Sequence, residues 1–173
     1  IFTRASQSEA STIQVMRFGN QVAIVTGAGR GIGHAIAVRL ANEGARVASV
    51  SRSEANAQRT AAEINTAHPD AAKAYAVDVA DHAAVQKTGA QILEDFGRVD
   101  ILINNAGVTR DGLSMRMPIE DWETVVDTNL KGAFSFSQSV MPARIQPPSG
   151  PLTTRSSHPG LHANAGPAHP RAG

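Results

Sequence analysis

Apolar residues follow two alternating patterns along the central part of the chain. Short runs that are almost continuously apolar occupy residues 22–26, 46–50, 73–77 and 99–103, and each run predicts a β-strand. The run at 99–103 has almost no polar break, which is typical of a strand buried on both faces of a sheet.

Between these runs, apolar residues return at helical spacing. The first helix is predicted over residues 35–44 from Ile32, Ala35, Ile36 and Leu40. Ser53 and Asp81 are predicted N-caps of two further helices, and a longer helix is predicted over residues 120–140. Because strands alternate with helices, we expect right-handed βαβ units around a parallel sheet. The predicted fold is therefore a doubly wound α/β domain with three layers, helix–sheet–helix.

The two ends of the chain differ from this pattern. Seven of the nine prolines lie after Met141, and no acidic residue follows Asp127. A fifth strand is due in this part, but residues 151–155 match a strand poorly because Pro151 removes a ladder donor. We therefore interpret 142–173 as a mostly irregular, proline-rich segment, and 1–17 as a disordered leader with Met16 as the natural start. The folded domain is expected over residues 18–141.

Composition excludes several classes of function. A formal net charge of +1 gives no indication of a nucleic-acid partner, and the absence of cysteine excludes disulfides and thiolate metal sites. No apolar run approaches the roughly 20 residues of a membrane helix. No signal peptide is recognisable, so we expect no membrane association and a cytoplasmic protein. The histidines show no metal-ligand spacing, hence no metal site is predicted, and Trp122 is interpreted as a core or interface anchor.

A glycine-rich segment joins the first predicted strand to the first helix, and it carries the main functional signal. Its residues are Thr26, Gly27, Ala28, Gly29, Arg30, Gly31, Ile32 and Gly33, in the spacing T-G-x-x-x-G-x-G. A strand, a glycine turn and a helix start together present backbone N–H groups and a positive helix end to a phosphate. The alternative is an ordinary turn between a strand and a helix. The phosphate interpretation predicts a Rossmann-like dinucleotide-binding domain.

The end of the second strand indicates which dinucleotide would bind. An acidic residue there would bind the ribose 2′-hydroxyl of NAD, but none lies between Gly44 and Ser53. Arg30 and Arg52 are present instead, and a guanidinium can take a 2′-phosphate through charge-assisted bonds. We therefore favour NADP(H) as the cofactor. The alternative is that both arginines are solvated surface residues.

Polar residues also follow the third and fourth strands. Asp78, with Val79, ends the third strand and either accepts from an adenine amino group or caps the next helix. Asn105, Ala106 and Gly107 end the fourth strand, where small residues leave room for a ligand or simply suit a turn. Asn129 lies inside the long helix, where a buried amide needs partners and an exposed one does not.

Taken together, these motifs resemble the short-chain dehydrogenase/reductase family over residues 17–141. Within it, the segments 105–111, 115–117 and 128–130 resemble the 3-oxoacyl-[acyl-carrier-protein] reductases. The resemblance implies NADPH-dependent reduction of a 3-oxoacyl thioester to the 3-hydroxyacyl thioester in fatty-acid biosynthesis. The implied substrate is an acyl thioester, carried on acyl carrier protein in that pathway. It also implies a homo-oligomer that pairs through the long helix.

The resemblance further implies an Asn/Ser/Tyr/Lys catalytic set, which this sequence matches only in part. Asn129 and Ser157 occupy the asparagine and serine positions, whereas Pro170 occupies the tyrosine position and the lysine would follow Gly173. The only tyrosine is Tyr75, far upstream. We therefore expect a fragment with impaired catalysis and a sheet that is incomplete on its C-terminal side. The alternatives are a non-catalytic NADP(H)-binding fragment and a general short-chain alcohol or sugar dehydrogenase.

Overall fold

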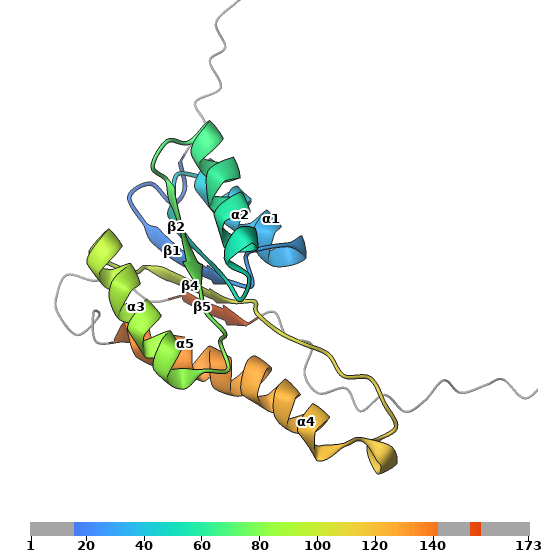
Figure 1. Cartoon of the computed structure of the whole chain (residues 1–173). Helices are drawn as coiled ribbons and strands as arrows, with labels where there is room; N and C mark the ends of the chain where they lie inside the picture. Colours follow the sequence, from blue (N-terminus) through green and yellow to red (C-terminus); the bar gives the residue numbers. More distant parts are fainter. Residues whose placement is uncertain (1–15, 142–152, 157–173) are drawn as a thin grey trace, which may run out of the picture.

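The computed structural model describes residues 16–141 and 153–156, which form a parallel β-sheet between two layers of helices (Figure 1). Five strands lie in the order β3-β2-β1-β4-β5. In chain order the elements are β1 (Val22–Thr26), α1 (Gly31–Asn42), β2 (Arg46–Ser51), α2 (Glu54–Ala67), β3 (Ala72–Ala76), α3 (His82–Phe96), β4 (Ile101–Asn104), η1 (Ser114–Arg116), α4 (Ile119–Val126), η2 (Asp127–Lys131), α5 (Gly132–Val140) and β5 (Thr153–Ser156). The predicted doubly wound, Rossmann-like fold is confirmed.

The central strand β1 divides the core into two halves. All five of its residues are buried, and their side chains alternate between the two faces of the sheet. Val22 and Ile24 join the cluster formed with α3 and α5, while Ala23 and Val25 join the cluster formed with α1 and α2. Both faces of the sheet therefore need apolar residues, which explains why β1 shows no polar alternation.

The strand order reverses beside β1, and this reversal indicates where a ligand would bind. β1 pairs with β2 on one side and with β4 on the other, so the connections leave in opposite directions. In an open α/β sheet, ligands bind outside the carboxyl ends of the strands at such a switch point. The segments after β1 to β4 all meet at this edge.

The predicted helix over 120–140 is three elements in one continuous run. The five-residue π-helical segment η2 separates α4 from α5. Such a segment commonly marks a functional position in a helix. α4 has no buried residue, and Trp122 is 43% exposed, so of its two predicted roles the core anchor is wrong and the interface anchor stays a prediction.

The fifth strand corrects one part of the sequence analysis. Residues 142–173 were interpreted as mostly irregular, but Thr153–Ser156 pairs in parallel with Ile101–Asn104 of β4. Strand pairing uses backbone N–H and C=O groups, and β4 presents its outer edge to any extended segment. The described pairing starts at Thr153, and Pro151 lies outside the described residues.

The start of the folded part also differs slightly from the prediction. Met16 and Arg17, assigned to the leader, lie in the described part, where Arg17 Nε is 3.7 Å from Glu43 Oε2. Residues 1–15 lie outside it. Among the described residues, none of the helices has both the length and the apolar character needed to cross a membrane.

Candidate functional site

The glycine loop after β1 is tightly packed against the loop after β4. A Cβ on Gly27 would lie 2.9 Å from Ala106 Cα, and one on Gly33 would overlap Gly27 O and Asn105 Nδ2. Gly31, at the start of α1, has φ +57° with nothing near its Cβ position, so there the backbone conformation favours glycine. The glycine pattern thus reflects close approach at two positions and backbone geometry at a third.

Thr26, a predicted cofactor-binding residue, uses its hydroxyl to join the two loops. Its Oγ1 donates to Ile103 O (3.3 Å) and accepts from the backbone N–H groups of Asn105 and Ala106 (both 3.0 Å). The side chain is buried, 2% exposed. Because its donor and both acceptor positions are used, Thr26 shapes the site and has no side-chain bond left for a ligand.

Two asparagines hold the loop after β4. Asn105 Nδ2 donates to Thr26 O (3.1 Å), which keeps the loop against the end of β1. Asn129 Oδ1 accepts from Val108 N (2.8 Å), and its Nδ2 donates to Val108 O (2.9 Å). Gly107 is needed beside this pair, since a Cβ there would lie 3.1 Å from Asn129 Oδ1. Asn129 is half-buried, and both polar atoms of its amide are hydrogen-bonded. This matches the expectation that a buried amide needs partners.

A cavity of about 550 Å³ opens at this edge of the sheet and brings three predicted residues together. They are Arg30 from the glycine loop, Arg52 after β2 and Asp78 after β3. Within the described part of the chain, the side chains of both arginines are exposed and form neither a hydrogen bond nor an ion pair. Two unpaired guanidinium groups at the mouth of a cavity suit an anionic group such as a phosphate.

Asp78 and Val79 have different roles in the structure. Asp78 is exposed to the cavity, although its Oδ1 accepts from Ala80 N (3.0 Å) in a local turn. Asp81 is the residue that caps α3, accepting from Ala84 N at 3.0 Å. Val79 is 7% exposed and packs where Gly132 begins α5, so its side chain belongs to the core. Of this pair, only Asp78 offers a side chain to a ligand.

The rest of the cavity lining consists of residues that were not selected from the sequence as site residues. They are Ala80, Val108, Arg110, Glu120, Glu123, Thr124, Asp127 and Thr128. Arg110 forms an ion pair with Asp121 on α4, with Nε 3.2 Å from Oδ1. In the sequence, the α4 residues have the polar character of a solvated helix face, and only the tertiary fold brings them to the same cavity as Arg30 and Arg52. Ser157, predicted as catalytic, lies outside the described residues.

Tyr75, the only tyrosine in the sequence, does not line this cavity. It lies on β3, 6% exposed, and its hydroxyl donates to Asp95 Oδ2 on α3 at 2.7 Å. Burial raises the pKa of Tyr75 well above its usual value, and the hydrogen bond to Asp95 adds to this shift. The pKa of Asp95 is lowered by its bonds to Lys73 and Tyr75. Tyr75 therefore stays protonated at neutral pH and does not supply an acid–base group to the site.

The histidines of the described part make structural contacts between elements. His34 Nε2 lies 2.9 Å from Glu63 Oε2 on α2, and His82 Nδ1 lies 3.0 Å from Ser135 Oγ on α5. Across residues 16–141 and 153–156, three or more His, Asp or Glu side chains are nowhere grouped so as to hold a metal ion.

Comparison with known proteins agrees with this architecture. Residues 21–169 match the family model for short chain dehydrogenases. The 3-oxoacyl-[acyl-carrier-protein] reductase of Escherichia coli is 40% identical over 154 residues, 89% of this chain and 62% of that protein. The Staphylococcus aureus enzyme of the same name is 41% identical over 148 residues, 85% of this chain and 60% of that protein. The chain thus spans about three-fifths of the length of these curated relatives.

Two solved structures share the fold. A protein from Sinorhizobium meliloti described as a short-chain alcohol dehydrogenase superposes with a TM-score of 0.74 at 36% identity, covering 81% of this chain and 55% of that one. A short chain dehydrogenase from Burkholderia cenocepacia, solved in complex with NADP, has a TM-score of 0.69 at 37% identity, covering 73% and 51%. Sequence, topology and the site at the switch point agree: the chain belongs to the short-chain dehydrogenase family of oxidoreductases.

Proposed function

We propose that this chain binds NADP(H) in the cavity at the carboxyl edge of its sheet. The observation that carries the proposal is the pair Arg30 and Arg52 on one cavity, with no acidic residue at the end of β2. The glycine loop fits a diphosphate, since side chains at Gly27 and Gly33 would overlap its neighbours and α1 begins there without an acidic residue. The Burkholderia relative, solved with NADP, supports the same cofactor.

The cofactor preference is tested by fluorescence titration of NADPH and NADH. Arg30→Ala and Arg52→Ala should each lower the affinity for NADPH by about tenfold, which is the scale of one lost charge-assisted contact. The affinity for NADH should be nearly unchanged. Arg39→Ala is the matched control, because Arg39 is an exposed arginine on α1 that pairs with Glu43 outside the cavity. Equal losses for NADPH and NADH in the two site variants would show that the arginines do not bind the 2′-phosphate.

We further propose that the reaction of the whole enzyme is reduction of a 3-oxoacyl thioester. The two 3-oxoacyl-[acyl-carrier-protein] reductases at 40% and 41% identity support this substrate class. When bound, NADPH would supply the hydride. Asn129 would hold the loop after β4 through its bonds to Val108, and Ser157 would orient the substrate carbonyl.

For the 173-residue chain we expect little turnover. Its only tyrosine is bonded to Asp95 away from the cavity, and loss of a general acid typically costs about 10²–10⁴-fold. The assay is NADPH oxidation with acetoacetyl thioester beside the Escherichia coli relative. Turnover matching that relative would refute the expected impairment. Activity only toward alcohols or sugars would instead favour a general short-chain dehydrogenase.

A second candidate is a non-catalytic NADP(H)-binding module. It is favoured by one observation: the lining that the described residues supply runs from position 30 to position 128, and Arg30, Arg52 and Asp78 are all part of it. Saturable NADPH binding without turnover on any oxo or hydroxy substrate would support it. The absence of saturable binding would contradict both candidates.

We also propose that the chain forms a homo-oligomer through the long helix. Ile119, Trp122, Leu130, Phe134 and Met141 are all exposed, and their spacing follows one helical stripe over α4 and α5. Sedimentation velocity tests this proposal, with Phe134→Glu expected to shift the chain to the monomer. A wild-type chain that sediments as a monomer at all concentrations would contradict it.

A further inference from the structure

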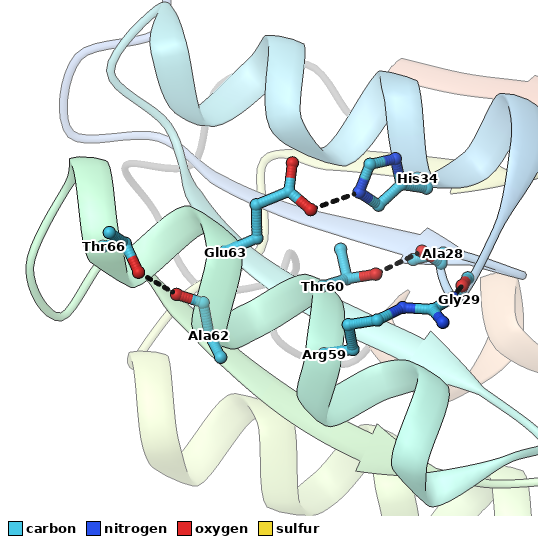
Figure 2. Close-up of polar contacts among 8 residues, drawn as sticks. All are labelled: Ala28, Gly29, His34, Arg59, Thr60, Ala62, Glu63 and Thr66. Carbon is cyan, nitrogen blue, oxygen red and sulfur yellow. Dashed lines mark hydrogen bonds and ion pairs between the residues drawn. The ribbon is translucent and has the colours of Figure 1, made fainter.

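The back of the glycine loop is held by side chains of α2. Thr60 Oγ1 donates to Ala28 O at 2.9 Å, and Arg59 Nη2 donates to Gly29 O at 2.9 Å (Figure 2). These are two successive carbonyl groups of the loop, and both are drawn toward α2. Neither α2 residue belongs to the glycine motif or lines the cavity.

The direction of these carbonyls determines the direction of the next N–H groups. In a planar trans peptide unit, the C=O of one residue and the N–H of the next point in opposite directions. Since Ala28 O and Gly29 O point toward α2, the N–H groups of Gly29 and Arg30 point away from it. The two bonds from α2 therefore give the loop a pair of donors directed away from the helix, as an anion requires.

Burial makes the Thr60 contact difficult to replace. Thr60 and Ala28 are both 0% exposed, so water cannot take the place of a lost hydroxyl donor. The helix is also packed closely against the loop, because a Cβ on Gly29 would lie 2.6 Å from Asn56 Cβ and 2.8 Å from Ser51 Oγ. The Glu63–His34 contact ties the same face of α2 to α1 (Figure 2).

We propose that Thr60 and Arg59 are positioning residues that set the phosphate-binding conformation of the glycine loop. Thr60 fixes the peptide between Ala28 and Gly29 from a buried position, and Arg59 fixes the following peptide from the surface. The proposal rests on the proposed NADP(H) site and deepens it. Affinity for the dinucleotide should therefore depend on two α2 side chains that do not touch it.

The test compares three substitutions on the same helix in the full chain. Thr60→Val keeps the shape and removes the hydroxyl donor, and Thr60→Ser restores it. Thr66→Val is the matched control, because Thr66 Oγ1 donates to Ala62 O within α2 at 2.9 Å (Figure 2). Kd for NADPH is measured by fluorescence titration well below each melting temperature, and the amide signals of Gly29 and Arg30 are followed by NMR.

We expect Thr60→Val to weaken NADPH binding about tenfold and Thr60→Ser to remain within about threefold of wild type. Thr66→Val should be unchanged, and the Gly29 and Arg30 amide signals should shift only in Thr60→Val. Should Thr60→Val fail to fold, Arg59→Met tests the same idea from an exposed position, with an expected loss of about threefold.

Two outcomes would overturn the inference. One is unchanged NADPH affinity in Thr60→Val and Arg59→Met. The other is a loss in Thr60→Val that accompanies a lower melting temperature and that Thr60→Ser does not restore, since that would be a purely structural effect. A wild-type chain that does not bind NADPH would instead contradict the proposed function itself, so the two failures are distinguishable.

Discussion

Thr26→Val should destabilise the chain although it keeps the shape and apolar character of the side chain. The hydroxyl of Thr26 accepts from the N–H groups of Asn105 and Ala106 and donates to Ile103 O. Valine can make none of these bonds. The N–H of Ala106 would lose its partner beside a side chain that is 2% exposed, where water does not replace it easily, whereas the N–H of Asn105 would keep its bond to Ile103 O at 3.1 Å.

The size of the effect follows from the groups left without partners. An unsatisfied buried donor costs about 1–3 kcal/mol. Ala106 is only partly buried and the N–H of Asn105 keeps one acceptor, so we expect a loss of about 1–2 kcal/mol in total. That is a large share of the roughly 5–15 kcal/mol by which a domain is stable.

Thr26→Ser makes the comparison decisive. Serine keeps the hydroxyl and loses one methyl group, which costs about 0.8 kcal/mol. If burial alone mattered, valine would be the better replacement and serine the worse one. The hydrogen bonds predict the reverse order, in which serine is tolerated and valine is not.

The assay is equilibrium urea unfolding followed by far-UV circular dichroism. With a slope of about 1–3 kcal/mol per molar urea, Thr26→Val should lower the midpoint by about 0.3–2 M with an unchanged slope. Thr66→Val serves as the control, since its exposed hydroxyl bonds only within α2 and the change should stay within about 0.5 kcal/mol. A Thr26→Val chain as stable as Thr26→Ser would refute the reasoning.

Three further predictions concern packing and pH. Gly33→Ala should lower the free energy of unfolding by about 1–3 kcal/mol, because the added Cβ would overlap the glycine loop. Gly112→Ala is the control and should be nearly neutral, because the space around its Cβ is open. The melting temperatures of the two variants are compared with that of the wild type. Tyr75 has a raised pKa in the folded chain, so its stabilising effect is complete below about pH 10 and is lost at higher pH. Absorbance titration should therefore show phenolate only together with unfolding, and ionisation of the folded chain near pH 10 would contradict this. Asp95 has a lowered pKa, so stability is retained above about pH 4 and falls at lower pH; the fall should be smaller in Asp95→Asn, and equal pH profiles would contradict the expectation.

Local signals in the sequence predicted most of the fold. Ser53 and Asp81 cap α2 and α3 as expected, accepting from Asn56 N at 3.4 Å and Ala84 N at 3.0 Å. The first four strands lie within about two residues of the predicted ranges. These features depend on residues near one another in the chain, so periodicity and capping chemistry are sufficient to find them.

The features that the sequence analysis missed all depend on distant contacts. β5 forms because the outer edge of β4 offers backbone groups, and the residues of β5 themselves match a strand poorly. Thr60 lies on the buried face of α2, at helical spacing from Ala57 and Ile64, so its burial follows the local pattern. Its hydrogen bond to Ala28 O depends on the approach of the glycine loop, which no local pattern reveals.

The roles of the polar motif residues also follow from the geometry of the switch point. β1 and β4 end side by side at the switch point, and beyond Asn104 the described chain leaves the sheet as a loop. Asn129 supplies what a strand neighbour would, because its amide pairs with both the N–H and the C=O of Val108. Thr26 does the same from β1.

Consequently, several residues that read as ligand contacts in the sequence serve first to build the crevice. Their side-chain bonds go to the backbone of the loops that form it. Within the described residues, the side chains of Arg30 and Arg52 make no such bonds although both line the cavity. If the cavity binds NADP(H) as proposed, their position, rather than the presence of a glycine motif, would give the site its preference among dinucleotides, because the 2′-phosphate is the group that they would distinguish.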